Sequence, residues 1–257
     1  MKKIIVLISY LIWTIILSGC AHSNVDEFAA FRAKTDSELL DSAENALAKK
    51  DYSKSVKLFE ALDAIYPFGS YAEQGQLDII YAYYKQGDDI SALVAADRYT
   101  RLYPRGNHAD YAYYMEGILA FSQNLSWLQK LVNIDPSSLD VSNLRQSFYS
   151  FQSVVVYFPN SIYAPDAKLH MAYIRNVMAN RDILIAQFYM QRKAYVAAVN
   201  RASTVVQHYQ GSPQVRDALV IMVKAYRRLG LTQMAEASAQ VLSASYPDSK
   251  AFLNLHR

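Results

Sequence analysis

The sequence is poor in residues that break helices, with eight glycines and seven prolines among 257 residues. Alanine and leucine are common, and no alternation of apolar and polar residues lasts beyond a few positions, which argues against half-buried strands. These features predict an all-α protein. The 26 Lys and Arg residues nearly balance the 23 Asp and Glu residues, so we expect no nucleic acid as a partner.

Motifs of common enzyme active sites are also missing. The sequence has no Gly-x-Ser-x-Gly, no His-Glu-x-x-His, no phosphate-binding loop and no dinucleotide fingerprint. Its five histidines are dispersed, and we interpret His108 and Asp110 as a helix cap and a first-turn acid, not as metal ligands. We therefore expect neither catalysis nor a metal, and no cofactor apart from covalently bound lipid.

The single cysteine, Cys20, follows a basic start, an apolar run over residues 4–17 and two small residues. This order is typical of a cleavable export signal, and it resembles a bacterial lipoprotein signal. The resemblance implies cleavage after residue 19 and attachment of S-diacylglycerol and an N-acyl chain to Cys20. The alternatives are a plain secretory signal and an uncleaved anchor, but fourteen residues fall short of the roughly 20 that span a bilayer.

The residue after the cysteine, Ala21, resembles the pattern of lipoproteins sent to the outer membrane. Two or three acyl chains hold a protein to a bilayer without a spanning helix. We therefore predict a signal peptide over 1–19, a lipidated tether over 20–34, and a chain anchored at the periplasmic face of the cell outer membrane.

An aromatic residue followed mostly by proline recurs along the chain. The five occurrences are Tyr66-Pro67, Tyr103-Pro104, Phe158-Pro159, Tyr209-Gln210 and Tyr246-Pro247. Their spacings of 37, 55, 51 and 37 residues include the period of tetratricopeptide repeats, in which each helix pair buries its apolar face only against its neighbours. The pattern predicts a tetratricopeptide-repeat solenoid of about five helix pairs.

Glycine, proline and turn residues place the helices within these repeats. The predicted pairs are 36–49 with 52–66, 71–86 with 89–103, a helix from Asn107 with 143–158, a helix from near Ile162 with a partner that closes at Gln210, and 213–229 with 232–246. The third repeat carries an insertion of eighteen residues through Asp135-Pro136-Ser137-Ser138. The first helix of the fourth repeat is predicted to be long, because neither Gly nor Pro occurs between Asp166 and Gln210.

The repeat template also predicts which side chains face the concave groove. In the second and third repeats these are Gln74, Leu77, Tyr81, Tyr84, Lys85, Tyr111, Tyr114, Ile118 and Phe121. In the fifth repeat they are Asp217, Lys224, Arg227 and Arg228. An aromatic end and a charged end suggest a scaffold with two different clients. For any single tyrosine, ordinary packing between repeats is the alternative.

Several blocks resemble the BamD family of outer-membrane assembly lipoproteins. They are Glu60–Asp63, Tyr66–Gly69, Gln76–Lys85, Val199–Arg201 and Arg216–Leu219. The resemblance implies a non-enzymatic scaffold of the β-barrel assembly machinery. Its N-terminal repeats, 35–160, would take up unfolded outer-membrane β-barrel proteins. Its C-terminal repeats, 161–250, would dock the last POTRA domain of the central barrel subunit, with a tail over 251–257 and accessory assembly lipoproteins as further partners.

The candidate substrate-binding residues are Phe68, Tyr71, Gln76, Tyr81 and Tyr84. For POTRA docking the first candidate is Arg201, with Arg216 and Asp217 behind it; an intramolecular ion pair is the alternative for each. The chain departs from the family at Glu116, where arginine is frequent, in the insertion, and at Gln210, and the first two departures concern predicted partner surfaces. The competing hypothesis is another periplasmic repeat lipoprotein, such as a secretin pilotin or a coordinator of envelope constriction.

Overall fold

The structure is a computed structural model that describes residues 28–123 and 141–247. Over these residues it consists of a short 3-10 helix, η1, and ten α-helices, with no strand. The helices are η1 Ala29–Phe31, α2 Asp36–Ala48, α3 Tyr52–Ile65, α4 Ala72–Gln86, α5 Asp89–Leu102, α6 Ala109–Gln123, α8 Ser142–Tyr157, α9 Ala164–Gln191, α10 Tyr195–His208, α11 Gln214–Arg228 and α12 Thr232–Ser245. None of the described helices is long and apolar enough to cross a bilayer.

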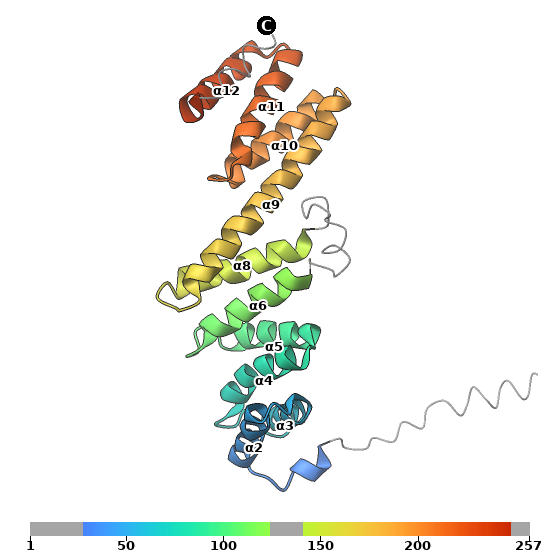
Figure 1. The fold of residues 1–257 in the computed structure, drawn as a ribbon, viewed down its shortest axis with the longest axis vertical. Helices are drawn as coiled ribbons and strands as arrows, with labels where there is room; N and C mark the ends of the chain where they lie inside the picture. The colour runs from blue at the N-terminus through green and yellow to red at the C-terminus, as the bar shows by residue number, and fades with distance from the viewer. Residues whose placement is uncertain (1–27, 124–140, 248–257) are drawn as a thin grey trace, which may run out of the picture.

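The helices form an elongated solenoid of five antiparallel pairs (Figure 1). Consecutive helices pack against each other, and four separate clusters of buried side chains follow one another along the axis. This arrangement is the tetratricopeptide fold, in which stability comes from contacts between neighbouring repeats. The predicted fold class and helix pairs are confirmed. The signal, Cys20, most of the insertion and the tail lie outside the described residues.

Local sequence signals explain where the helices begin and end. Thr35 accepts a hydrogen bond from the Glu38 backbone N–H, and the Glu38 carboxylate accepts one from the Thr35 N–H, which forms a capping box at α2. Asp51 and Asp88 cap α3 and α5 with one side-chain bond each, which they accept from the backbone N–H groups of Lys54 and Ser91. Gly87 ends α4 with a φ of 87°, a left-handed conformation that favours glycine.

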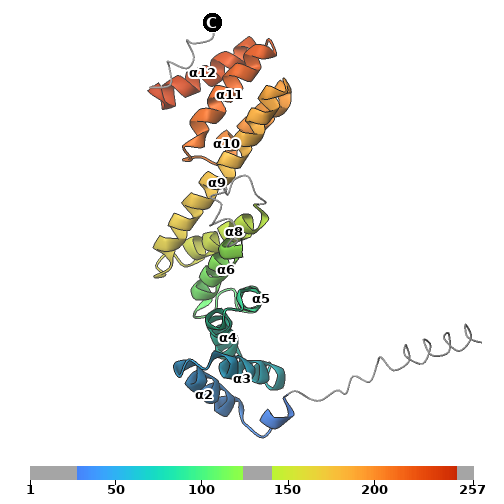
Figure 2. The same ribbon diagram turned by 45° about the vertical axis from the view of Figure 1, so that its right-hand side comes forward.

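The longest helix, α9, has 28 residues and so extends about 42 Å. Its N-terminal part packs on α8, and its C-terminal part packs on α10 and α11. Figure 2 shows α9 running from the third repeat to the fourth. The absence of glycine and proline predicted this length, and the consequence is one rigid rod shared by the two halves of the solenoid.

Candidate functional site

A row of aromatic side chains crosses the first helices of the second, third and fourth repeats. We define this aromatic row as Tyr81 and Tyr84 on α4, Tyr111, Tyr114 and Phe121 on α6, and Tyr163, His170 and Tyr173 at the start and along α9. The rings of Tyr114 and Tyr163 stack with centroids 4.7 Å apart, and Tyr111 lies 5.9 Å from Tyr163. Phe121 meets His170 at 5.0 Å and Tyr173 at 5.7 Å. The row therefore joins residues far apart in the sequence.

Hydrogen bonding fixes the middle of the row. The Tyr114 hydroxyl donates to Asp166 Oδ2 at 2.8 Å, and His170 Nε2 lies 3.4 Å from the same oxygen. Burial, assisted by the bond to Asp166, raises the pKa of Tyr114 to about 12. Below these groups the buried Phe151 ring stacks on His170 at 4.8 Å. The middle of the row is thus preorganised and keeps its hydroxyls protonated at neutral pH.

The α4 end of the row is open to solvent. Tyr81 is 39% exposed and Tyr84 is 41% exposed. The Lys85 ammonium lies 5.4 Å from the Tyr81 ring centroid and 5.9 Å from that of Tyr84, within range of cation–π attraction. Tyr111, in contrast, is mostly covered, and burial raises the pKa of its hydroxyl. Among the described residues that hydroxyl has no hydrogen-bond partner.

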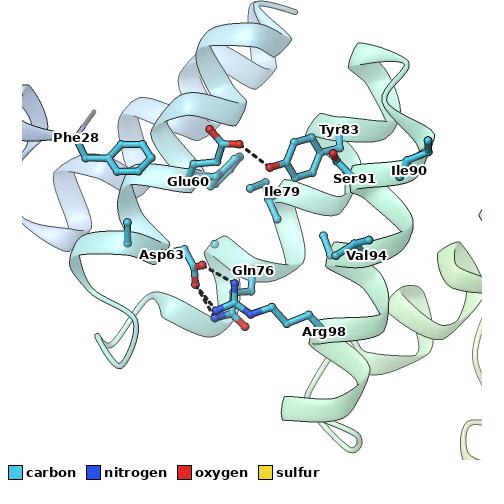
Figure 3. A pocket seen from close by; sticks show the side chains of 14 residues that line it. Phe28, Glu60, Asp63, Gln76, Ile79, Tyr83, Ile90, Ser91, Val94 and Arg98 are labelled. Atoms are coloured by element: carbon cyan, nitrogen blue, oxygen red, sulfur yellow. Dashed lines mark hydrogen bonds and ion pairs between the residues drawn. The ribbon is translucent and has the colours of Figure 1, made fainter. Parts of the chain in front are cut away.

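Two of the candidate substrate-binding residues lie at a different surface. Phe68, which is 98% exposed, and Gln76, which is 7% exposed, both line a cavity of about 510 Å³ with Leu102. Gln76 also lines a cavity of about 580 Å³ between α3, α4 and α5 (Figure 3). The five residues therefore divide: Tyr81 and Tyr84 belong to the aromatic row, Phe68 and Gln76 to the α3–α5 cavities. Tyr71 is exposed just before α4.

Gln76 is held in place by an internal polar network. Its Nε2 donates to Asp63 Oδ1 at 2.9 Å, and Arg98 reaches across from α5 to give Asp63 two bonds at 2.6 and 2.9 Å (Figure 3). On the other side of this cavity, Tyr83 donates to Glu60 at 2.7 Å. The Gln76 amide nitrogen and both Asp63 oxygens are thus used within the chain, whereas the buried Gln76 Oε1 has no hydrogen-bond partner among the described residues.

The Arg201 site is a charged cavity. Arg201 Nη1 lies 3.3 Å from Asp182 Oδ1, and the two line a cavity of about 430 Å³ between α8, α9 and α10. Asp182 is 8% exposed; burial raises the pKa of its carboxyl, and Arg201 opposes this shift. Arg145 and Arg181 line the same cavity. Three guanidinium groups surround one carboxylate, so the cavity carries excess positive charge and suits an acidic group.

Sequence reasoning missed Arg145, Arg181 and Asp182, because they come from helices that only the fold brings together. Arg216 and Asp217 are elsewhere, at the start of α11, where they form a partly exposed ion pair of 3.6 Å with each other. They are not among the residues that line the Arg201 cavity. Three acidic, His or Cys side chains that could hold a metal do not cluster anywhere within the described part of the chain.

Glu116 does not lie on a free partner surface. It is buried between α5, α6 and α8, where Thr100 and Gln146 lie within 3.4 and 3.5 Å of its carboxylate oxygens. Burial raises the pKa of this carboxyl. Beside it, Gly117 allows α6 and α8 to approach closely, because a Cβ at this glycine would lie 2.7 Å from the Phe151 ring. The departure from the family at Glu116 therefore concerns packing between repeats.

Comparisons with known proteins identify the family of the chain. The family model YfiO, described as an outer membrane lipoprotein, matches residues 32–242. The chain is 36% identical over 251 residues to the outer membrane protein assembly factor BamD of Neisseria meningitidis, covering 97% of this chain and 93% of that protein. It is 37% identical to the protein of the same name from Vibrio cholerae, covering 80% of this chain and 86% of that one.

Solved structures with lower similarity include the MamA protein, at 13% identity and a TM-score of 0.37, covering 86% of this chain and 97% of that one. Another is a tetratricopeptide repeat protein from Parabacteroides merdae, at 12% identity and a TM-score of 0.38, covering 84% of this chain and 69% of that one. The family model and the curated relatives decide the assignment. The chain belongs to the YfiO family of outer membrane lipoproteins, the family of the BamD assembly factors.

Proposed function

We propose that the chain is a non-enzymatic scaffold for the assembly of outer-membrane β-barrel proteins, held by lipid on Cys20 at the periplasmic face of the outer membrane. In this proposal the aromatic row binds unfolded barrel proteins, and the Arg201 cavity docks a POTRA domain of the central barrel subunit. Its relatives are named outer membrane protein assembly factors. The observation that carries the proposal is the partly exposed aromatic row on adjoining repeats.

The aromatic row suits an extended, apolar and aromatic peptide. A β-barrel strand that faces lipid carries alternate apolar side chains, with aromatic residues near the membrane interfaces. Exposed rings such as Tyr81 and Tyr84 stack such side chains, and each aromatic pair contributes about 0.5–1.5 kcal/mol beyond its buried area. Their hydroxyls can form hydrogen bonds with backbone groups of the bound strand. An unfolded client needs such bonds, because its backbone N–H and C=O groups are not yet paired within a sheet.

The Arg201 cavity suits an acidic side chain of the docking domain. Asp182 pairs with Arg201 at 3.3 Å, and Arg145 lines the same cavity, so an incoming carboxylate could bind the Arg145 guanidinium fork in two-point geometry. The site lies where α8, α9 and α10 meet, so docking there would contact the third and fourth repeats together.

A peptide-binding assay tests the substrate role. The probe is a fluorescent peptide of the last strand of a β-barrel protein, ending in an aromatic residue. We expect the double variant Tyr81→Ala/Tyr84→Ala to bind about tenfold or more weakly, since two aromatic contacts are lost. The matched control is Tyr157→Ala on α8, an exposed tyrosine outside the row. Equal binding by wild type and double variant, or an equal loss in the control, would contradict the proposal.

A charge reversal tests the docking role. We expect Arg201→Glu to weaken binding to the cognate POTRA domain by about 2–5 kcal/mol, because it removes a cation and leaves Asp182 facing another carboxylate. Arg192→Glu is the control, since Arg192 lies at the end of α9 over the Phe188 ring and away from the cavity. Circular dichroism of both variants checks that the helices persist. Wild-type affinity in Arg201→Glu would refute the assignment.

A further inference from the structure

Of the described residues that line the Arg201 cavity, Asp182 alone is acidic. It is 8% exposed and lies in the stretch of α9 that also buries Ala179, Ile183 and Ala186. A carboxylate buried among apolar side chains costs folding free energy unless cations and hydrogen bonds compensate its charge. Asp182 is therefore unfavourable for the fold to the extent that its surroundings fail to compensate it.

The compensation by Arg201 is incomplete. Asp182 accepts one hydrogen bond from Arg201, from Nη1 to Oδ1 at 3.3 Å. The Arg98–Asp63 pair, in contrast, has two bonds, at 2.6 and 2.9 Å. The pKa of the Asp182 carboxyl is raised, because the effect of burial exceeds the opposing effects of the nearby arginines. The ion pair with Arg201 thus offsets only part of the cost of burying this carboxylate.

Arg201 can bind a second carboxylate while it faces Asp182. A guanidinium has five N–H donors in a planar fork, and Asp182 accepts from only one of its nitrogens. The side chain of Arg201 is 48% exposed, whereas that of Asp182 is 11% exposed. Solvent and partners therefore have access to the guanidinium, and a carboxylate that binds it there comes close to Asp182.

Asp182 has two opposing effects on such a ligand. It orients Arg201, which favours binding, and it repels an incoming carboxylate, which disfavours binding. A single bond of 3.3 Å to a half-exposed side chain orients that side chain weakly. Water screens the repulsion little, because Asp182 is buried. We therefore expect the repulsion to be the larger of the two effects.

We propose that Asp182 is an internal competitor for Arg201: it pairs with this guanidinium in the free protein, and a carboxylate of the docking domain displaces it in the complex. The inference rests on the proposed docking role of the Arg201 cavity. Docking is then the replacement of one ion pair by another, and Asp182 lowers the affinity of the cavity for its partner.

Two further arginines support the replacement. Once Arg201 binds the partner, Asp182 would remain as a buried carboxylate. Arg145 on α8 and Arg181 on α9 line the same cavity, and both oppose the rise in the pKa of Asp182, which means that both attract its charge. The buried carboxylate therefore keeps cations beside it when Arg201 turns to the partner.

A neutral variant tests the competition. Asp182→Asn keeps the size of the side chain and removes its charge. We expect the full lipidated chain with this change to bind the purified cognate POTRA domain about tenfold more tightly than wild type at the same salt concentration, as isothermal titration calorimetry measures. The matched control Asp97→Asn removes the same charge from an exposed ion pair with Arg101 on α5, and it should change the affinity less than about twofold.

A second pair of variants tests whether the competition is for Arg201. In the Arg201→Gln background, Asp182→Asn should change the affinity less than about twofold, because the guanidinium for which the two carboxylates compete is gone. A gain of the same size with and without Arg201 would show a general effect of charge and would overturn the inference.

Thermal unfolding of the Asp182→Asn variant provides a readout of a purely structural role. We expect its unfolding temperature to equal or exceed that of the wild type, because the change removes an incompletely compensated buried charge. A lower unfolding temperature would mean that the ion pair serves the fold, and the inference would fail.

The binding results separate this inference from the docking role on which it rests. If Asp182→Asn binds the POTRA domain as weakly as wild type or more weakly, while Arg201→Glu still loses binding, the docking role stands and the competitor role of Asp182 is refuted. If the wild type and Asp182→Asn both fail to bind the domain, the docking role and the inference fail together.

Discussion

Gly117, where α6 packs closely on α8, gives a prediction about stability. Whether alanine there stabilises or destabilises the fold depends on the space around it. Gly117 lies within α6, and a Cβ placed on it would be 2.7, 2.8 and 2.9 Å from three atoms of the Phe151 ring. That ring is fully buried and stacked on His170, so it has no free volume to move into. Gly117→Ala should therefore strain the contact between α6 and α8.

The magnitude follows from two opposing effects. Alanine is favoured over glycine inside a helix by about 1 kcal/mol, whereas an extra methyl group in a well-packed core costs about 1–3 kcal/mol. With a rigid ring as the obstacle, we expect Gly117→Ala to lower the free energy of unfolding by about 1–2 kcal/mol. Gly75→Ala is the control: its Cβ would meet the end of the flexible Leu62 side chain, so its net effect should lie within about 0.5 kcal/mol of zero.

Urea unfolding followed by far-ultraviolet circular dichroism measures both effects. The variant Gly117→Ala/Phe151→Leu adds a further check, because a smaller side chain at position 151 relieves the clash and the double variant should lose less stability than the sum of the single changes. If Gly117→Ala proves as stable as the wild type, or if the two losses add, the close contact does not limit this position and the reasoning fails.

Three further predictions concern single groups. Burial raises the pKa of Glu116, so the folded state keeps the carboxyl proton to a higher pH than the unfolded state does. The contribution of protonated Glu116 to stability is therefore greatest in acid and is lost as pH rises through the folded pKa. In urea unfolding, Glu116→Gln should exceed wild-type stability at pH 7 by a margin that shrinks towards pH 4. A constant margin would contradict this. Tyr114→Phe removes the donor to Asp166 and should cost about 1 kcal/mol in thermal unfolding. Tyr113→Phe is the control, because the Tyr113 hydroxyl has no hydrogen-bond partner among the described residues. Cys20→Ser should abolish the mass of the attached lipid in intact-protein mass spectrometry and release the chain from membranes; a variant that stays membrane-bound would refute lipid anchoring.

The sequence predicted where the helices begin and end better than it predicted which side chains contact each other between helices. Aromatic and proline residues mark the ends of α3, α5, α8 and α12, and the lack of glycine and proline correctly indicated the length of α9. These features act within one helix or one turn, so they can be read along the chain. The repeat template likewise placed Tyr81 and Tyr114 together because both occupy equivalent faces of first helices.

Contacts between repeats were not readable in the same way. Gln76, a candidate substrate-binding residue from the family resemblance, bonds Asp63 instead of lying beside Tyr81, and Arg98 from α5 bonds the same carboxylate. The partners on α3 and α5 are distant in the sequence, so no local pattern indicates them. Asp182 meets Arg201 because α9 continues past its template length. Arg145, from a third helix, enters the same cavity, and no spacing in the sequence connects it with these two residues.

The continuous helix α9 sets both the separation and the angular phase of the two proposed binding regions. Asp166, beside the aromatic row, and Asp182, in the Arg201 cavity, are sixteen residues apart on it, a separation of about 24 Å. Inserting seven helical residues between them would increase their separation along α9 by about 10 Å and nearly preserve the relative direction of the two regions. Inserting one residue would instead rotate one region relative to the other by about 100°. Distance and direction between client and docking domain can thus be altered independently of the chemistry at either end.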